Sequence, residues 1–136
     1  MKLKTPLTLA ALVISAALSP AVHASEEVLV LGVNDALTGG GAVYGLPQAN
    51  AVQMAADEIN AAGGIKAGSI TYKLKVITSD DKANPTEATN SVRKLIDRDN
   101  VKYLVGFCCS GSTSAVASFI AKEDALMQVS NDAERA

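Results

Sequence analysis

Strand-like and helix-like patterns of apolar residues alternate along this chain. Residues 28–33 form a nearly continuous apolar run, which predicts a strand covered on both faces. Residues 72–76 alternate apolar and charged side chains, which predicts a strand with one solvated face or at a sheet edge. Two further apolar runs, 103–107 and 126–129, complete a set of four predicted strands.

Helical patterns fill the intervals between these strands. Pro47 can begin a first helix, and Gly63-Gly64 can end it. Asn84 is a suitable N-cap for a second helix, with Pro85 at its first position. A third helix is expected from about residue 112 to residue 122.

The resulting βαβαβαβ order predicts an α/β fold. We expect a partial Rossmann-like parallel sheet with right-handed crossovers, helices on both faces and the strand order 2-1-3-4. In such a sheet, ligands bind beyond the carboxyl ends of the strands, where the strand order reverses. That point lies between the first and third strands, so the loops 35–46 and 108–112 are the candidate binding loops.

The second of these loops is rich in hydroxyl groups and runs into a predicted helix. Backbone N–H groups and side-chain hydroxyls at a helix N-terminus suit a carboxylate or another small anion. The alternative is that Ser110 or Ser112 only caps the third helix. A cap accounts for one hydroxyl rather than four in five positions, which favours a ligand site made by Ser110, Gly111, Ser112 and Thr113.

The first loop contains Gly39-Gly40-Gly41 but fails the dinucleotide-binding pattern, because Tyr44 stands where a third glycine is required. The Tyr44 ring could instead cover an apolar ligand side chain, or it could pack on its own loop. No cofactor is expected. Asp80-Asp81 could form a metal pair, but two carboxylates after a strand are more typical of solvated turns, and no metal site is predicted.

The first 24 residues have the features of a secretory signal peptide. Lys2 and Lys4 precede an uncharged apolar run at 7–18, and Val22-His23-Ala24 suits a cleavage site before Ser25. The apolar run is shorter than the roughly 20 residues that a membrane span needs. Residues 1–24 are therefore predicted to be a leader, and residues 25–136 the exported domain.

Charge and histidine content narrow the function of that domain. Without Lys2 and Lys4, 10 basic residues face 14 acidic ones, a formal charge of −4, which argues against nucleic-acid binding. The one histidine, His23, lies in the leader. A domain without imidazole has no Ser-His or Cys-His nucleophile pair, which argues against an enzyme.

Cys108 and Cys109 are the only cysteines and are adjacent. They could be two small buried residues at a strand end. Alternatively, they could form a labile vicinal disulfide or a bond to another chain, and a bond between neighbours would be strained.

Six segments follow one another along the chain: 33–45, 51–65, Asp80-Asp81, Asn84-Pro85, Val105-Gly106 and 109–113. In order and spacing, they resemble the Leu/Ile/Val-binding proteins of ABC importers. The resemblance implies a type I periplasmic binding fold, a small-molecule ligand and an ABC permease in the inner membrane as partner. It also implies that residues 25–136 are an incomplete N-terminal ligand-binding lobe in the periplasm, with apolar surface and a sheet edge uncovered.

The resemblance also assigns roles to particular residues. Ser110 matches the principal contact to the ligand carboxylate, and Tyr44 falls where an aromatic ring covers the ligand. The loop after the fourth strand, with Asp132, Ala133 and Glu134, also falls in the binding region. Its two acids stand where small or hydroxyl residues are usual, which favours a cationic or amide-bearing ligand.

The cysteines differ from the usual family pattern as well. Cys109 matches a cysteine that often pairs with one near position 83, but this chain has Ala83.

Two other functions fit parts of the pattern. One is a ligand-sensing lobe of a membrane receptor or regulator, and the other is a secreted enzyme with a cysteine nucleophile.

Overall fold

A computed structural model describes residues 25–123 and 125–129. The predicted leader therefore lies outside the described residues. The elements in chain order are β1 (Ser25–Asp35), the 3-10 turn η1 (Gly39–Gly41), α1 (Ala42–Ala61), β2 (Ile65–Ala67), β3 (Ile70–Asp80), α2 (Pro85–Asp97), β4 (Tyr103–Gly106), α3 (Ser110–Ile120) and β5 (Leu126–Val129).

The strands form one sheet in the order β2-β3-β1-β4-β5. The four predicted strands correspond to β1, β3, β4 and β5, all parallel, and their predicted order is confirmed. The expectation of a purely parallel sheet is wrong at one edge, where β2 pairs antiparallel with β3. The turn between them contains Gly68 at φ 61°, a conformation that glycine adopts without strain.

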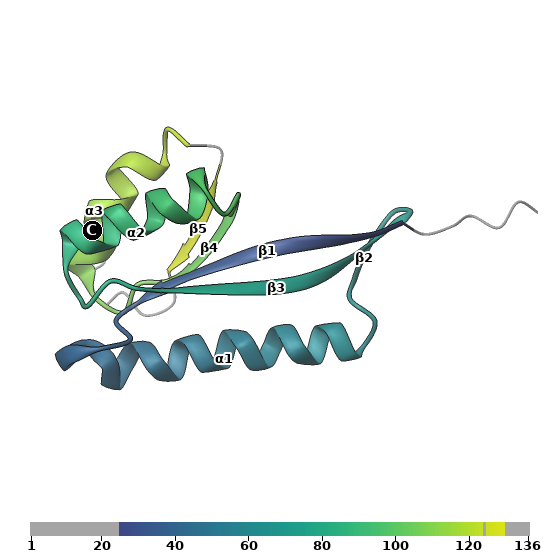
Figure 1. Cartoon of the computed structure of the whole chain (residues 1–136), viewed down its shortest axis with the longest axis horizontal. Coiled ribbons are helices and arrows are strands. Elements are labelled where there is room, and N and C mark those ends of the chain that lie inside the picture. Colours follow the sequence, from purple (N-terminus) through teal and green to yellow (C-terminus); the bar gives the residue numbers. More distant parts are fainter. Residues whose placement is uncertain (1–24, 124, 130–136) are drawn as a thin grey trace, which may run out of the picture.

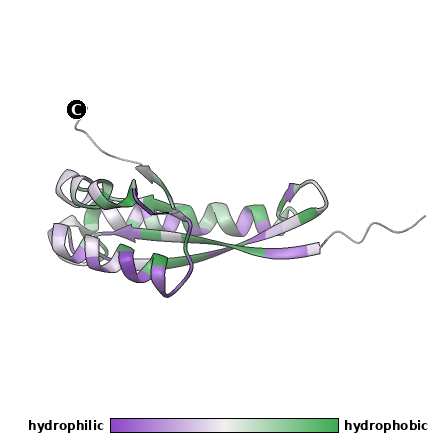
Figure 2. Ribbon diagram, turned by 90° about the horizontal axis from the view of Figure 1, so that it is seen from above, coloured by the Kyte–Doolittle hydropathy of each residue, from purple (hydrophilic) through white to green (hydrophobic). Residues whose placement is uncertain are grey.

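β1 and β3 are longer than their neighbours. They pair from Ser25↔Ile70 to Asp35↔Asp80, whereas β4 pairs only with the stretch of β1 from Leu31 to Asn34. The two long strands therefore extend past the rest of the sheet (Figure 1). β1 begins with hydrophilic residues, is mainly hydrophobic over residues 28–33 and ends with Asn34 and Asp35 (Figure 2).

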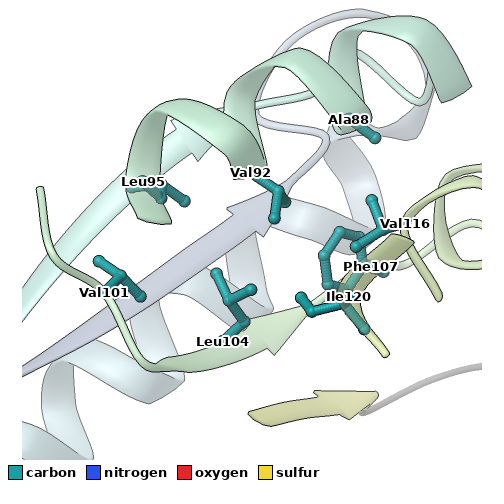
Figure 3. Close-up of a cluster of buried hydrophobic side chains, with 8 residues drawn as sticks. All are labelled: Ala88, Val92, Leu95, Val101, Leu104, Phe107, Val116 and Ile120. Carbon is teal, nitrogen blue, oxygen red and sulfur yellow. The ribbon is translucent and has the colours of Figure 1, made fainter. Parts of the chain in front are cut away.

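Helices cover both faces of the sheet, as predicted. α1 runs along β1 and β3 on one face, and α2 and α3 lie together on the other (Figure 1). The main core lies under α2 and α3 (Figure 3), and it comprises Ala88, Val92, Leu95, Val101, Leu104, Phe107, Val116 and Ile120.

The second helix begins as the sequence predicts. Asn84 is its N-cap, and the Asn84 Oδ1 accepts hydrogen bonds from the backbone N–H groups of Thr86 at 2.9 Å and Glu87 at 3.1 Å. Pro85 occupies the first turn, where its missing N–H removes no helical hydrogen bond.

The other two helices begin earlier than predicted. α1 begins at Ala42 and includes Pro47, because Gly45 lets its first turn lie directly on the backbone of Ala36. A Cβ at Gly45 would fall 2.1 Å from the Ala36 carbonyl oxygen. α3 begins at Ser110, with Cys109 as its N-cap, rather than at about residue 112.

α1 leaves part of its sheet face uncovered. Tyr103 on β4 is 41% exposed and Leu126 on β5 is 69% exposed. Beside them, β1, β4 and β5 line an open trough of about 440 Å³. Uncovered apolar surface was expected here, and it lies at the β5 edge of the sheet.

Candidate functional site

The candidate site lies where the chain leaves β1 and β4. These strands are neighbours, and their last paired residues are Asn34 and Gly106. The N–H of Phe107 donates to the Asn34 carbonyl oxygen at 2.9 Å, and the N–H of Cys108 donates to Asp35 Oδ1 at 3.0 Å. The predicted meeting of the loops after these two strands is therefore present, because one backbone hydrogen bond and one to the Asp35 carboxylate hold the start of one loop against the end of β1.

A sharp bend after β4 makes this contact possible. Gly106 has φ 133°, and a Cβ there would lie 2.4 Å from the Asn34 carbonyl oxygen. Phe107 follows at φ 65° with its side chain fully buried in the core. The predicted strand 103–107 therefore ends one residue early, and the burial of Phe107 offsets the cost of its left-handed backbone.

Asp80, at the end of β3, fixes the loop that follows β1. Its Oδ1 accepts hydrogen bonds from the N–H groups of Leu37 at 2.9 Å and Thr38 at 3.3 Å, and its Oδ2 accepts one from the Thr38 hydroxyl at 2.5 Å. The N–H of Lys82 donates to the same Oδ1 at 2.9 Å. Burial alone would raise the pKa of Asp80, but these hydrogen bonds favour the carboxylate and hold the pKa below its usual value.

The environment of Asp81 shifts its pKa in the opposite direction. Its residue is 1% exposed, and its Oδ1 accepts from the N–H of Ala83 at 2.8 Å. The Asn34 amide approaches its Oδ2 at 3.4 Å, and the Ser91 hydroxyl donates to Asn34 Oδ1 at 2.5 Å. Burial raises the pKa of Asp81, and the hydrogen bond from Ala83 offsets only part of that effect.

The two carboxylates together hold a strained turn. Lys82 and Ala83 both have positive φ, 54° and 56°. Each donates its N–H to the carboxylate two residues before it. The turn delivers Asn84 to its place as the cap of α2. The expectation that Asp80-Asp81 would be a solvated turn is therefore wrong for Asp81, which is buried because the turn folds back on β1.

The serine loop does not present all its hydroxyls to one open spot. Ser112 is fully buried beside Asp81, and its oxygen has no hydrogen-bond partner of normal geometry. Thr113 is 7% exposed and donates its hydroxyl to the Cys109 carbonyl oxygen at 3.2 Å. Ser110 is half-buried and Gly111 is exposed at the first turn of α3. These two residues remain at the surface, whereas Ser112 and Thr113 hold the turn from within.

The alternative interpretation of these serines as helix caps is also wrong. Cys109 occupies the N-cap of α3, and its side chain makes no capping hydrogen bond. Ser110 and Ser112 are the first and third residues of the helix.

Tyr44 lies on the first turn of α1 and is 59% exposed. The structure thus places it in a helix rather than in the predicted loop. η1, which precedes it, lies against the β4 loop, because a Cβ on Gly41 would come within 3.8 Å of Cys108 Sγ and 3.1 Å of the Ala83 Cβ. The Tyr44 ring does not pack away inside its own segment, which leaves it available for contact with a ligand.

The two cysteines are both half-buried, and neither is in a disulfide. Their Sγ atoms are 3.0 Å apart. Burial, the neighbouring Cys109 thiol and the Asp35 carboxylate all raise the pKa of the Cys108 thiol.

Sequence reasoning missed Asn34 and Asp35, which are fully buried at the centre of the site. Two polar residues directly after the buried apolar run 28–33 were the available signal, because polar groups at the end of a central strand need buried partners. Asp35 Oδ1 accepts from the N–H groups of Ala36 and Cys108, both at 3.0 Å, while Asp35 Oδ2 is buried without a partner.

The remaining predictions concern residues 132–134, metal binding and membrane spans. Asp132, Ala133 and Glu134 lie outside the described residues. Within 25–123 and 125–129, no group of three or more His, Cys, Asp or Glu side chains is arranged to hold a metal ion. No helix in the same residues combines the length and apolarity needed to cross a membrane.

Comparison with known proteins gives a consistent result. A family model described as "Periplasmic binding protein" matches residues 29–134. An amino acid binding protein of Pseudomonas aeruginosa is 36% identical over 103 residues, which cover 76% of this chain and 26% of that protein. The Leu/Ile/Val-binding protein of Escherichia coli K12 is 33% identical over 104 residues, covering 76% and 27%. The chain thus spans about a quarter of the length of these relatives.

Solved structures agree. The branched-chain amino acid transporter substrate binding protein LivJ from Streptococcus pneumoniae, in complex with isoleucine, matches with a TM-score of 0.68 and 29% identity over 78% of this chain and 30% of that chain. A solute binding protein of an ABC transporter from Rhodopseudomonas palustris, in complex with 3,4-dihydroxybenzoic acid, matches with a TM-score of 0.64 and 27% identity over 75% and 26%. The sheet and helices described above are therefore those of the type I periplasmic binding fold.

Proposed function

The chain belongs to the periplasmic binding protein family, and from that premise we propose that it supplies part of the N-terminal lobe of a solute receptor for an ABC importer. The proposed ligand is a branched-chain amino acid or a related small carboxylate, amide or amine. One observation carries the proposal: α3 begins beside the end of β1, at the reversal of strand order, and the side chain of its N-cap residue, Cys109, makes no capping hydrogen bond.

The ligand group proposed for this lobe is a carboxylate. N–H groups at the start of a helix attract an anion because the helix dipole is positive there. The ligands of the two solved relatives, isoleucine and 3,4-dihydroxybenzoic acid, differ in shape and charge but share a carboxyl group. A lobe that binds the shared group accommodates both kinds of ligand.

Each candidate residue has a distinct proposed role. Ser110 and the Gly111 N–H contact the carboxylate, since both remain at the surface of the turn. The buried Ser112 and Thr113 position that turn. Tyr44 covers the apolar part of the ligand with its exposed ring.

The loop 132–134 would set the selectivity. Asp132 and Glu134 flank Ala133 in the sequence. Acids at this place favour a ligand that also carries an amine or amide, because a second negative charge would be repelled.

The proposed location and partner follow from the same family. Residues 1–24 act as a leader cleaved before Ser25, the domain works in the periplasm, and an ABC permease in the inner membrane receives the ligand. The proposed role is binding without catalysis.

A ligand-sensing lobe of a membrane receptor is the second candidate, because the same lobe serves either role. The gene sequence after the codon for Ala136 separates them. A second lobe followed by a stop codon supports transport, whereas membrane spans with a signalling domain support sensing.

Titration calorimetry of the complete protein tests the binding role. We expect binding of leucine or of a small amide or amine, weakened at least tenfold by Ser110→Ala, since a hydrogen bond to a charged group contributes about 1.5–3 kcal/mol. Ser114→Ala, on the exposed side of the same helix, is the matched control and should bind as the wild type does. Equal affinity of the Ser110→Ala variant and the wild type would overturn the assignment of the carboxylate site.

A further inference from the structure

The pair Cys108-Cys109 has a geometry that ordinary packing does not require. The two Sγ atoms are 3.0 Å apart, closer than two sulfur atoms that only pack together. Both thiols are half-buried rather than enclosed, so a small reagent can reach the pair. The close approach and the partial exposure together allow the two thiols to react with a small reagent and with each other.

Asp35 fixes the position of Cys108 and acts on its thiol. The N–H of Cys108 donates to Asp35 Oδ1 at 3.0 Å, and the Cys108 thiol faces the same carboxylate. The carboxylate raises the pKa of the Cys108 thiol, so Cys108 stays protonated while Cys109 reacts first.

We propose that Cys108 and Cys109 are a thiol-modification site that forms a reversible vicinal disulfide by exchange with an exogenous disulfide, R–S–S–R. The Cys109 thiolate attacks one sulfur of the reagent, so that a Cys109–S–S–R bond forms and R–S⁻ leaves and takes up a proton. The Cys108 thiol then attacks Cys109 Sγ and its proton passes to the departing R–S⁻, so that the Cys108–Cys109 bond forms as the bond from Cys109 to the S–R group breaks. The two cysteines lose two electrons and two protons, and the reagent is reduced to two R–SH.

Cys109 acts first because burial suppresses the thiolate of Cys108. Attack on a disulfide requires a thiolate, and the raised pKa of Cys108 leaves little of it at neutral pH. In the second step the Cys109 sulfur is already in place beside Cys108, which compensates for the weak acidity of the Cys108 thiol.

The bond is labile rather than structural. Adjacent residues have Cα atoms about 3.8 Å apart, less than the roughly 4.4–6.8 Å found in ordinary disulfides. The closed loop holds no intervening residues, so the bond scarcely constrains the unfolded chain. Strain of this kind makes a disulfide easier to reduce.

Ring closure also affects the candidate binding loop. The sulfur atoms must move from 3.0 Å to about 2.05 Å. Cys109 is the N-cap of α3 and Ser110 is its first residue. Oxidation therefore changes the backbone directly at the turn that carries Ser110, so the redox state of the pair sets the shape of that turn.

Mass spectrometry of the native full chain tests the proposal. The protein is treated with excess oxidised glutathione, quenched with acid, denatured and alkylated. We expect a monomer that has lost two hydrogen atoms, takes up no alkylating reagent and regains both thiols after treatment with reduced glutathione. Two alkylated cysteines after oxidation, or a disulfide-linked dimer as the sole product, would overturn the proposal.

Two single variants separate the steps. Cys108→Ser leaves the attacking thiol without its partner and should accumulate a glutathione adduct on Cys109. Cys109→Ser should form little adduct on Cys108. The reverse pattern contradicts the proposed order, and the wild-type mass measurement decides the proposal even where a variant fails to fold.

Discussion

The Asn60 side chain forms two hydrogen bonds with the backbone of Leu74, at the edge of β3. Its amide donates to the Leu74 carbonyl oxygen, and its Oδ1 accepts from the Leu74 N–H, both at 2.8 Å. β2 pairs with β3 only as far as Tyr72, so the edge of β3 would be unpaired at Leu74. One side chain from α1 thus serves as a substitute for a neighbouring strand.

Removal of this side chain should destabilise the fold. Asn60→Ala leaves a partly buried N–H and C=O of Leu74 without partners, and we expect a loss of about 1–3 kcal/mol in the free energy of unfolding. Urea unfolding followed by circular dichroism measures it. Asn50→Ala, at an exposed position of the same helix, should change the midpoint little; equal effects at both positions would contradict the role of Asn60 at the edge of β3.

The contact of α1 with Ala36 gives a steric prediction. Gly45→Ala places a Cβ 2.1 Å from the Ala36 carbonyl oxygen. Because the obstacle is backbone, we expect a loss of about 1–3 kcal/mol or more. Gly40→Ala has no atom within 4 Å of the new Cβ and is the control. A Gly45→Ala variant as stable as Gly40→Ala in thermal unfolding would show that the helix packs elsewhere.

The contribution of Asp80 to the free energy of unfolding should increase with pH. The pKa of Asp80 is lowered in the folded state. At pH values just below the usual Asp pKa, the unfolded chain therefore binds more protons than the folded chain. The free energy of unfolding rises with pH in that range. Asp80→Asn should therefore cost about 1 kcal/mol near pH 7, and its difference from the wild type should shrink as the pH falls through the titration of the carboxyl group. Urea midpoints across pH test this, with Glu26→Gln as an exposed control.

The contribution of Asp81 to the free energy of unfolding should decrease as the pH rises. Its pKa is raised by burial, so the folded chain keeps a proton that the unfolded chain has lost, and stability falls as the pH rises above the usual Asp value. The wild type should therefore lose stability relative to Asp81→Asn as the pH rises above the usual Asp value of about 4. A difference between the two proteins that is independent of pH would mean that folding does not shift the pKa of Asp81.

The sequence predicted the parts of the fold that local patterns determine. Asn84-Pro85 carries its own capping chemistry, and the apolar run 28–33 is typical of a central strand. β2 escaped prediction because Ile65–Ala67 is short and has no buried residue, so its pairing depends on the turn at Gly68. The start of α1 was misplaced because it depends on the contact of Gly45 with Ala36, which no local pattern reveals.

The sequence predicted where the candidate site lies, but not the direction of its side chains. Alternating strands and helices place the loops after β1 and β4 together, whatever their side chains are. The inward direction of Ser112 could not be predicted, because it follows from the first turn of α3 and from Asp81 across the fold. A hydroxyl-rich loop therefore indicates a site without showing which hydroxyls face the ligand.

The position of Ser25 also bears on the proposed cleavage of the leader. Ser25 is the first residue of β1, and its N–H donates to the Ser69 carbonyl oxygen at 3.2 Å. No spacer then separates the proposed cleavage site from the sheet. A peptidase needs residues on both sides of the bond to be extended and accessible, a condition that ends once β1 lies beside β3. With the proposed cleavage before Ser25, leader removal and the pairing of β1 with β3 would compete, and a precursor that folds first would shield its own cleavage site.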